Sequence, residues 1–172
     1  MHELAYTYLD TPIGPLLVAG DGDHLHTIGF ARNGRPHPPA HDWRHDERPL
    51  TEALAELREY FDGTRTEFTV PLTFSGTPLE EAVWRAMACI PYGATTSYGA
   101  IAREIGEPPS ASRAVGAAAG ANPLPIVIPC HRVIGADGSL TGFGGGLETK
   151  SFLLSLERRV QPAPGAQLGL FD

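Results

Sequence analysis

LAYTYLDTPIGPLLVAGDGDHLHTIGF, residues 4–30, has the pattern of three short β-strands. Its apolar stretches, 4–9, 16–19 and 25–30, are separated by the turn-forming runs TPIG and DGD. Short apolar segments joined by such turns are typical of antiparallel strands. The stretch therefore predicts a small antiparallel meander in the N-terminal half of the chain.

The residues that follow predict one helix against this meander. Residues 31–49 contain four prolines and three histidines without any period, which favours a surface loop. Residues 51–61 place apolar side chains at helical spacing, so we expect a helix that faces the sheet. Residues 66–72 are expected to form a further short strand. Together these elements predict an N-terminal α+β subdomain, residues 1–76.

The C-terminal half has mainly helical patterns. A helix is expected over 78–90, followed by a turn at Pro91-Tyr92-Gly93. Two shorter helices, 97–105 and 110–121, surround a proline-containing break, and Ser110 is expected to cap the second one. Such a pair is a helix-turn-helix pattern, which also occurs in many helical domains that do not bind DNA.

Residues 126–128 predict a brief strand, which Pro129 ends just before Cys130. The glycine-rich run 142–146 then leads to a last helix over 148–158. We expect residues 77–160 to form a mainly helical subdomain and residues 161–172 to form a flexible tail.

Composition favours a soluble intracellular protein, which we expect to be cytoplasmic. Two cysteines in 172 residues are too few for a disulfide framework. No apolar run approaches the roughly 20 residues that cross a bilayer, and the N-terminus lacks the pattern of a signal peptide. We therefore expect no membrane contact.

The net charge of −7 argues against a protein that holds nucleic acid by bulk electrostatics. The acidity is unevenly distributed, because residues 1–76 contain 6 basic and 12 acidic side chains, whereas residues 77–172 contain 7 and 8. Residues 108–136 contain no acidic side chain, and Arg113 lies within them. If DNA is a partner, this is where we expect it to bind.

Cys130 is the residue most suited to covalent chemistry. A cysteine after an apolar run and a proline is often an inert core thiol. Here, however, His131 and Arg132 follow at once, and neighbouring positive charge or a basic imidazole favours the reactive thiolate. His131 can reach the sulfur only if the chain turns at this point.

The sequence Pro129-Cys130-His131-Arg132-Val133 resembles the active-site signature of the O6-alkylguanine-DNA alkyltransferases. Six flanking segments agree with this family in order and spacing: 91–93, 96–99, 112–116, 122–126, 145–147 and 153–157. The resemblance is dense from about residue 78 to 157 and looser before it. It implies a ribonuclease-H-like N-terminal subdomain and a helix-turn-helix in the C-terminal one.

The resemblance also implies a catalytic set. Cys130 would be the nucleophile and permanent alkyl acceptor. His131 would take the thiol proton through a water, and Glu157 would orient the imidazole. Tyr98 would donate a proton or a hydrogen bond to guanine N3 as charge develops on the leaving base. No metal and no cofactor is implied.

Double-stranded DNA containing O6-alkylguanine is the partner that the resemblance implies, with the protein expected to act as a monomer. Because O6 lies within the base stack, the nucleotide must be flipped into a pocket. Arg113 would fill the gap that it leaves. The same helix would enter the minor groove through small residues. The expected contacts on this helix are Ser112, Arg113, Ala114, Gly116 and Ala117.

The substrate pocket would be lined by residues on both sides of Cys130. The expected lining residues are Pro125, Val133, Phe143, Gly144 and Gly145. Asn122 is a turn residue that we expect to support the active-site segment rather than to react. Some family members have a tyrosine where this chain has Phe143, which makes the range of accepted alkyl groups uncertain.

Other residues have plainer interpretations. His37, His41 and His45 have a spacing that could suit a metal, but a polar proline-broken loop explains them better. Cys89 is expected in the core. The tail residues Gln167, Leu168, Leu170 and Phe171 resemble a peptide that binds the bacterial sliding clamp, although a disordered tail has the same composition.

The expected function is direct DNA repair, in which an alkyl group moves irreversibly from O6 of guanine, or O4 of thymine, to Cys130. A lesion-binding protein of the alkyltransferase-like kind is the main alternative, but those proteins lack the acceptor cysteine. A cysteine hydrolase would instead turn over repeatedly without DNA. A transcription regulator would need more groove-reading side chains than this helix pair offers.

Overall fold

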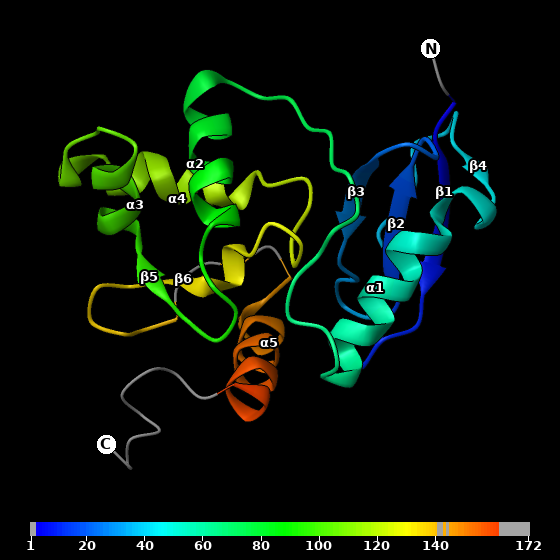
Figure 1. Cartoon of the computed structure of the whole chain (residues 1–172). Helices are drawn as coiled ribbons and strands as arrows, with labels where there is room; N and C mark the ends of the chain where they lie inside the picture. Colours follow the sequence, from blue (N-terminus) through cyan, green and yellow to red (C-terminus); the bar gives the residue numbers. More distant parts are fainter. Residues whose placement is uncertain (1–2, 141–142, 144, 162–172) are drawn as a thin grey trace. The chain divides into compact units, whose positions relative to one another are not determined.

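The computed structural model describes residues 3–140, 143 and 145–161. The chain divides into two compact units, Met1–Phe74 and Ser75–Asp172. The first contains an antiparallel sheet and one long helix, and the second is mainly helical (Figure 1). The expected α+β class is therefore confirmed.

The sheet of the first unit has the strand order β3-β2-β1-β4. Strands β1 (Ala5–Leu9), β2 (Leu16–Gly20) and β3 (Leu25–Gly29) form the expected antiparallel meander. The turn between β1 and β2 contains Gly14 at φ +97°, a conformation that glycine adopts without steric cost. All five residues of β2, the strand between β1 and β3, are buried.

The segment 31–49, expected to be a loop throughout, contributes a short fourth strand. Strand β4 (Arg44–His45) pairs in parallel with β1, and the His45 ring stacks on Tyr6 with 5.2 Å between the ring centroids. The sequence pattern did not indicate this strand because a pairing of two residues is too short to show a period of two.

The strand predicted over 66–72 is wrong, since only an isolated bridge joins Leu72 to Leu25. The backbone N–H groups of Thr69 and Val70 donate to the carboxylate of Glu56, at 2.9 and 3.2 Å, instead of to a neighbouring strand. Pro71 has no N–H to donate. The segment is therefore held by the side chain of a helix residue and by one backbone bond, from the N–H of Leu25 to the carbonyl of Pro71 at 2.8 Å.

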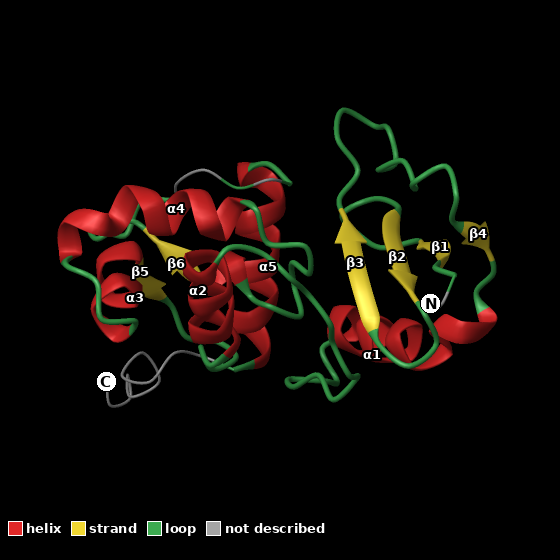
Figure 2. Cartoon of the chain, turned by 90° about the horizontal axis from the view of Figure 1, so that it is seen from above, coloured by secondary structure: helices red, strands yellow, loops and turns green. Residues whose placement is uncertain are grey.

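Helix α1 (Thr51–Asp62) lies along one face of the sheet, as expected (Figure 2). It buries Ala53, Leu54, Leu57 and Tyr60, which share one side of the helix. Burying a large apolar side chain of this kind contributes about 1.5–3 kcal/mol, so this stripe holds the helix in place. Gly63, at φ +80°, ends the helix in a left-handed cap.

In the second unit, α2 (Pro78–Ala88) begins with a complete capping box. The side chain of Thr77 accepts from the N–H of Glu80, and the Glu80 side chain accepts from the N–H of Thr77. Trp84 is buried, and its indole N–H donates to the carbonyl of Ala118 in α4 at 2.8 Å. This bond attaches α2 to the helix pair.

The expected helix pair is present as α3 (Tyr98–Glu104) and α4 (Ser112–Gly120). Ser97 caps α3 by accepting from the N–H of Ala100. The cap predicted at Ser110 is wrong, because that residue lies inside the 3-10 turn η2 (Pro109–Ala111). The chain enters α4 through this turn, in which the Ser112 hydroxyl donates to the carbonyl of Pro109 at 2.6 Å.

The strand predicted over 126–128 is also wrong. Ile126 has φ +76°, and the N–H of Ile128 donates to the carbonyl of Leu124 at 2.8 Å, so the chain turns back on itself. Leu124, Ile126 and Ile128 are nevertheless all buried. A turn that buries successive apolar residues has the same sequence pattern as a short buried strand, which explains the error.

The remaining elements surround this turn. The 3-10 turn η3 (Cys130–Arg132) leads into β6 (Val133–Ile134), which pairs in parallel with β5 (Thr96–Ser97). Helix α5 (Leu147–Val160) follows. None of the helices in the described part of the chain is long and apolar enough to cross a membrane.

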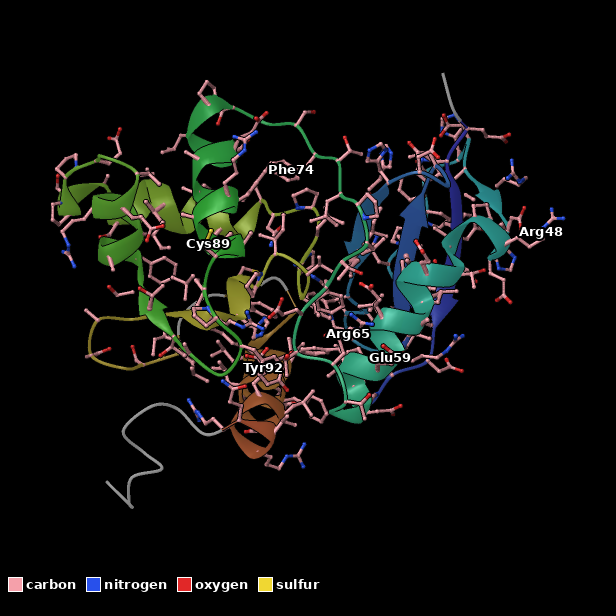
Figure 3. The ribbon with its side chains drawn as sticks, viewed as in Figure 1. Arg48, Glu59, Arg65, Phe74, Cys89 and Tyr92 are labelled. Carbon is pink, nitrogen blue, oxygen red and sulfur yellow. The ribbon has the colours of Figure 1, made fainter. Side chains whose placement is uncertain are left out.

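Cys89 is exposed, so its predicted place in the core is wrong (Figure 3). It is the C-cap of α2, one residue beyond the helix, and the next residue, Ile90, is buried. The helical period stops at Ala88, and the change of direction turns Cys89 outward.

Loss of the α2 cap should be measurable. We expect Thr77→Ala to lower the free energy of unfolding of the second unit by about 1 kcal/mol, because one N-cap acceptor is lost. Urea unfolding can be followed through Trp84 fluorescence in a Trp43→Phe background. Thr95→Ala, at an exposed threonine outside the helices of the same unit, is the matched control. An equal change in both variants would contradict a role for the cap.

Candidate active site

Cys130 begins the 3-10 turn η3, directly after Pro129. The turn is closed by the N–H of Arg132, which donates to the carbonyl of Pro129 at 3.0 Å. We expected the chain to turn here, because His131 could not otherwise approach the sulfur. The 3-10 turn η3 is that turn. Cys130 itself is partly exposed, whereas His131 and Arg132 are buried.

His131 and Glu157 form a buried pair. The imidazole Nε2 lies 2.6 Å from Oε2 of Glu157, and the two side chains are 0% and 1% exposed. Because an ionised carboxylate only accepts, Nε2 carries the hydrogen and the Nδ1 lone pair is left to accept a proton. Nδ1 is buried without a hydrogen-bond partner among the described residues. Burial, with smaller effects from the charges of Arg132 and Lys150, lowers the pKa of His131, which keeps the imidazole neutral.

The sequence suggested that the charge of Arg132 would favour the thiolate of Cys130, but in the structure Arg132 binds Glu157 instead. Its Nε and Nη2 atoms donate to the two carboxylate oxygens of Glu157, at 2.8 and 3.0 Å. Its Nη1 atom donates to the carbonyl of Ile90 at 2.6 Å, and its guanidinium lies 5.5 Å from the centre of the Tyr92 ring. The guanidinium of Arg132 therefore neutralises Glu157. It also links Glu157 to Ile90, just beyond the end of α2.

Glu157 remains ionised in spite of its burial. Burial opposes the charge, but hydrogen bonds and charge from His131 and Arg132 outweigh it and lower the pKa of Glu157 to about 2. The N–H of Gly93 also donates to Oε1 at 3.1 Å. The carboxylate thus has a fixed position and a fixed charge.

The thiol of Cys130 is protonated at neutral pH, contrary to the expectation that its neighbours would favour the thiolate. Burial raises the pKa of Cys130 to about 11, and a hydrogen bond with Asn122 and the charge of Lys150 offset this only in part. The thiol therefore needs a base when it reacts.

Asn122 holds the turn before Cys130 in shape. Its side-chain nitrogen donates to the carbonyl of Ile128 at 2.8 Å, and its side-chain oxygen accepts from the N–H of Leu124 at 2.9 Å. The first of these bonds reaches the segment predicted as a strand, residues 126–128, and the second lies in the turn before it. Together with its bond to Cys130, they place Asn122 at the centre of the active-site segment.

Lys150 is a residue of this site that the sequence interpretation missed. It is 0% exposed, its Nζ donates to the carbonyl of Val133 at 2.7 Å, and Nζ lies 5.9 Å from the centre of the Phe143 ring. Lys150, Leu153, Leu154 and Glu157 recur at three- and four-residue spacing, so the lysine lies on the buried stripe of α5. That position was the available signal.

The expected pocket residues are brought together only in part. Val133 and Phe143 both contact Lys150, as the hydrogen bond and the ring contact show. Pro125 is buried, and Gly145 is partly exposed. Gly144 lies outside the described residues.

Tyr98 is connected to the active-site segment through the small sheet. It follows β5 directly, and β5 pairs with β6, which begins one residue after the Cys130 turn. A Cβ atom placed on Gly116 would lie 3.8 Å from the Tyr98 ring, so the two helices of the pair meet at this glycine. Tyr98 is partly exposed.

Helix α4 presents a surface of small side chains. Val115, Ala118 and Ala119 are buried, whereas Arg113, Ala114 and Ala117 are exposed and Ser112 and Gly116 partly so. The exposed side thus carries one long cationic side chain among residues with little bulk. Such a surface can approach a nucleic-acid groove closely.

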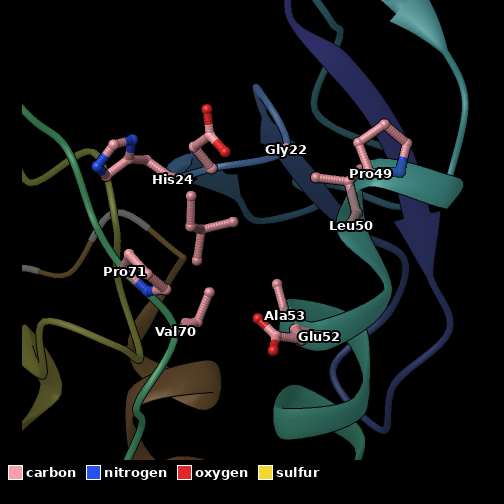
Figure 4. A pocket seen from close by; sticks show the side chains of 10 residues that line it. Gly22, His24, Pro49, Leu50, Glu52, Ala53, Val70 and Pro71 are labelled. Atoms are coloured by element: carbon pink, nitrogen blue, oxygen red, sulfur yellow. The ribbon is translucent and has the colours of Figure 1, made fainter.

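Three further candidate sites are the histidine-rich loop, a small pocket in the first unit and the C-terminal tail. No cluster of His, Cys, Asp and Glu in the described part of the chain could hold a metal ion, and His45 stacks on Tyr6 instead. The pocket between β3 and α1 in the first unit, near His24 and Glu52, has about 30 Å³ of space, which is room for about one or two waters (Figure 4). Gln167, Leu168, Leu170 and Phe171 lie outside the described residues.

Two family models match the chain. Residues 78–159 match the family model "6-O-methylguanine DNA methyltransferase, DNA binding domain". Residues 4–74 match the model "6-O-methylguanine DNA methyltransferase, ribonuclease-like domain". The two matches together span nearly the whole described chain.

Individual relatives are similar over their full length. A methylated-DNA–protein-cysteine methyltransferase of Mycobacterium tuberculosis is 47% identical over 167 residues, which are 97% of this chain and 98% of the relative. One from Methanosarcina acetivorans is 45% identical over 152 residues, covering 88% and 97%. The crystal structure of M. tuberculosis OGT in complex with DNA superposes with a TM-score of 0.85 at 46% identity, covering 98% of this chain and 99% of that one. The chain therefore belongs to the 6-O-methylguanine DNA methyltransferase family.

Proposed function

We propose that this protein repairs DNA directly, by transferring an alkyl group from O6 of guanine to Cys130 in a single irreversible reaction. The observation that carries the proposal is the buried pair of His131 and Glu157, in which His131 directly follows a partly exposed cysteine. A nucleophile, a neutral base and a carboxylate that orients the base form the arrangement required for nucleophilic displacement.

The first step is removal of the thiol proton. The proton of Cys130 passes through a water to Nδ1 of His131, and the imidazolium that forms is stabilised by Glu157. Because Arg132 keeps Glu157 ionised, the carboxylate is ready to receive this charge. A neutral imidazole at rest is essential, since a protonated one could accept no proton.

The second step is displacement at the alkyl carbon. The thiolate electron pair forms the S–C bond while the C–O6 bond breaks, and its electrons pass to the guanine ring. Tyr98 gives its hydroxyl proton to guanine N3, and the proton held by His131 replaces it through solvent. The products are S-alkylcysteine and an intact guanine. A neutral thioether is a poor alkyl donor and neutral guanine is a weak nucleophile, so the return reaction does not occur and each molecule reacts once.

Duplex DNA is the proposed partner, and the M. tuberculosis relative has been crystallised with DNA. The small residues of α4, Ser112, Ala114, Gly116 and Ala117, approach the minor groove. Arg113 replaces the flipped nucleotide in the stack. The everted base, an O6-alkylguanine or an O4-alkylthymine, enters a pocket bounded by Pro125, Val133, Phe143, Gly144 and Gly145. Asn122 supports this pocket without reacting.

The remaining expectations are part of the same proposal. Residues 77–160 bind DNA and carry the reaction, whereas residues 1–76 form the accompanying α+β subdomain. The protein acts as a monomer. It is located in the cytoplasm and, in a bacterium, is associated with the nucleoid. Gln167, Leu168, Leu170 and Phe171 in the tail 161–172 bind the sliding clamp. A lesion-binding protein that does not react is disfavoured by the presence of Cys130.

Stoichiometry tests the reaction itself. With excess duplex that carries O6-methylguanine, we expect one methyl group per protein molecule, located on the Cys130 peptide by mass spectrometry. Cys130→Ser should bind the duplex without accepting the methyl group, and Cys89→Ser, at the exposed second cysteine, is the control that should react normally. Turnover beyond one equivalent would contradict the mechanism.

Glu157 can be tested through both rate and acid stability. We expect Glu157→Gln to slow transfer by about 100-fold, since a neutral amide stabilises the imidazolium poorly. Because the folded protein holds the pKa of Glu157 at about 2, below an ordinary value of about 4.3, the carboxylate stabilises the fold above the ordinary pKa. That stabilisation is lost as the pH falls towards 2.

Acid unfolding followed by circular dichroism measures this part of the pH dependence. It should disappear in Glu157→Gln, whereas Glu148→Gln, at an exposed position in the first turn of the same helix, should keep it. An unchanged acid transition in Glu157→Gln would contradict the buried charge pair.

Arg113 can be separated from the chemistry by changing the substrate. We expect Arg113→Ala to slow transfer from duplex DNA about tenfold or more, because the gap left by the flipped nucleotide costs a few kcal/mol when it is unfilled. Transfer from a free O6-alkylguanine base should be unaffected. Arg158→Ala, at an exposed arginine of α5, controls for loss of positive charge. Equal slowing with the free base would rule out a role confined to base flipping.

A further inference from the structure

Lys150 is the only lysine in the chain, and its side chain is fully buried. The other 12 basic side chains are arginines. Lysine normally lies at the surface, since burial of an ammonium group is costly unless other groups stabilise its charge. A fold that buries its single lysine against the strand that follows its reactive cysteine therefore needs a physical reason.

Two contacts of Lys150 lie at the active-site segment. Its Nζ donates to the carbonyl of Val133, the first residue of β6 and the third after Cys130, at 2.7 Å. The same atom lies 5.9 Å from the centre of the Phe143 ring. The lysine thus reaches from the first turns of α5 to the strand that follows the nucleophile, and it lies among the residues assigned to the pocket.

The charge of Lys150 acts on Cys130, and the effect is mutual. Lys150 favours the ionised form of Cys130, and an ionised Cys130 favours the charged form of Lys150. Burial has the opposite effect on both groups, since it raises the pKa of Cys130 and lowers that of Lys150. In a region shielded from water, an opposite charge near the sulfur is worth more than it would be in solvent.

Before the thiol proton moves, the other titratable groups around this centre do not supply that charge. Arg132 and Glu157 bind each other, and His131 is neutral until it takes the thiol proton. Tyr92, in the loop between α2 and β5, is uncharged at neutral pH like any tyrosine, and burial raises the pKa of its hydroxyl further.

We propose that Lys150 is a positioning residue for alkyl transfer, whose buried ammonium stabilises the thiolate of Cys130 as it forms and anchors the start of β6 beside it. This inference rests on the proposed function. The transfer step is unchanged: the thiol proton still moves to His131, the S–C bond forms and the C–O6 bond breaks. Lys150 keeps its own proton throughout and lowers the energy of the anion between these events.

The test compares variants that separate charge from anchoring. Lys150→Met has a chain of similar length without charge or donor, and Lys150→Gln keeps a hydrogen-bond donor without charge. Arg158→Met removes an exposed positive charge from the same helix and is the matched control. For each protein, the rate of methyl transfer from O6-methylguanine duplex is measured across pH, and the ionisation of Cys130 is followed by thiolate absorbance with Cys130→Ser as the blank.

We expect both Lys150 variants to shift the pH–rate profile and the Cys130 ionisation upward by about one pH unit, which lowers the rate at neutral pH about tenfold. The rate should recover at high pH, and one methyl per molecule should still be transferred. Lys150→Gln should match Lys150→Met if charge dominates. A profile that keeps its midpoint and only loses amplitude would overturn the inference and leave the proposed function intact. Failure of the unaltered protein to accept a methyl group would instead overturn the proposed function.

A second measurement needs no change at Lys150. Because the chain has one lysine, protein labelled with ¹³Cε-lysine gives a single lysine resonance to titrate by NMR. Linkage is reciprocal, so the pKa of Lys150 should be lower in Cys130→Ser, and in the methylated protein, than in the unaltered protein. Identical titration curves in all three would refute the electrostatic coupling, even if the Lys150 variants failed to fold.

Discussion

The carboxylate of Glu157 is the group on which the active site depends. It accepts hydrogen bonds from the His131 ring, from two nitrogens of Arg132 and from the N–H of Gly93. These donors come from the Cys130 turn and from the loop after α2, while Glu157 itself comes from α5. A buried carboxylate is stable only when its charge and its lone pairs are satisfied, so these three segments must meet for the unit to fold.

This arrangement keeps Cys130 in its unreactive thiol form until the reaction begins. Burial keeps the thiol of Cys130 protonated, and the same burial keeps His131 neutral and able to accept a proton. Because the thiolate is the reactive form of cysteine, the sulfur stays unreactive until a proton moves within the site. In the proposed mechanism Cys130 can react only once. The burial of Cys130 and His131 therefore prevents the sulfur from reacting before the substrate is bound.

The fold was predictable where a period or a family motif was long enough to be distinct. The meander over residues 4–30, helix α1 and the pair α3–α4 followed from apolar spacing and turn residues. The strands expected over 66–72 and 126–128 were wrong, because a short apolar run has the same composition whether it pairs with a strand, donates to Glu56 or turns at Ile126. The prediction for Cys89 was wrong because the helix expected over 78–90 ends at Ala88, so Cys89 lies beyond it and is exposed.

The sequence by itself determined the family and predicted the nucleophile and the base beside it, since the motif Pro129-Cys130-His131-Arg132-Val133 and its flanks are contiguous and specific. Only the tertiary structure decided which groups these residues contact. It directed Arg132 to Glu157 instead of the sulfur, and it placed Lys150 beside Val133 and Phe143. The physical reason is that periodicity shows which residues of a helix share a buried face, whereas the charge on that face and its partners depend on segments far away in the chain.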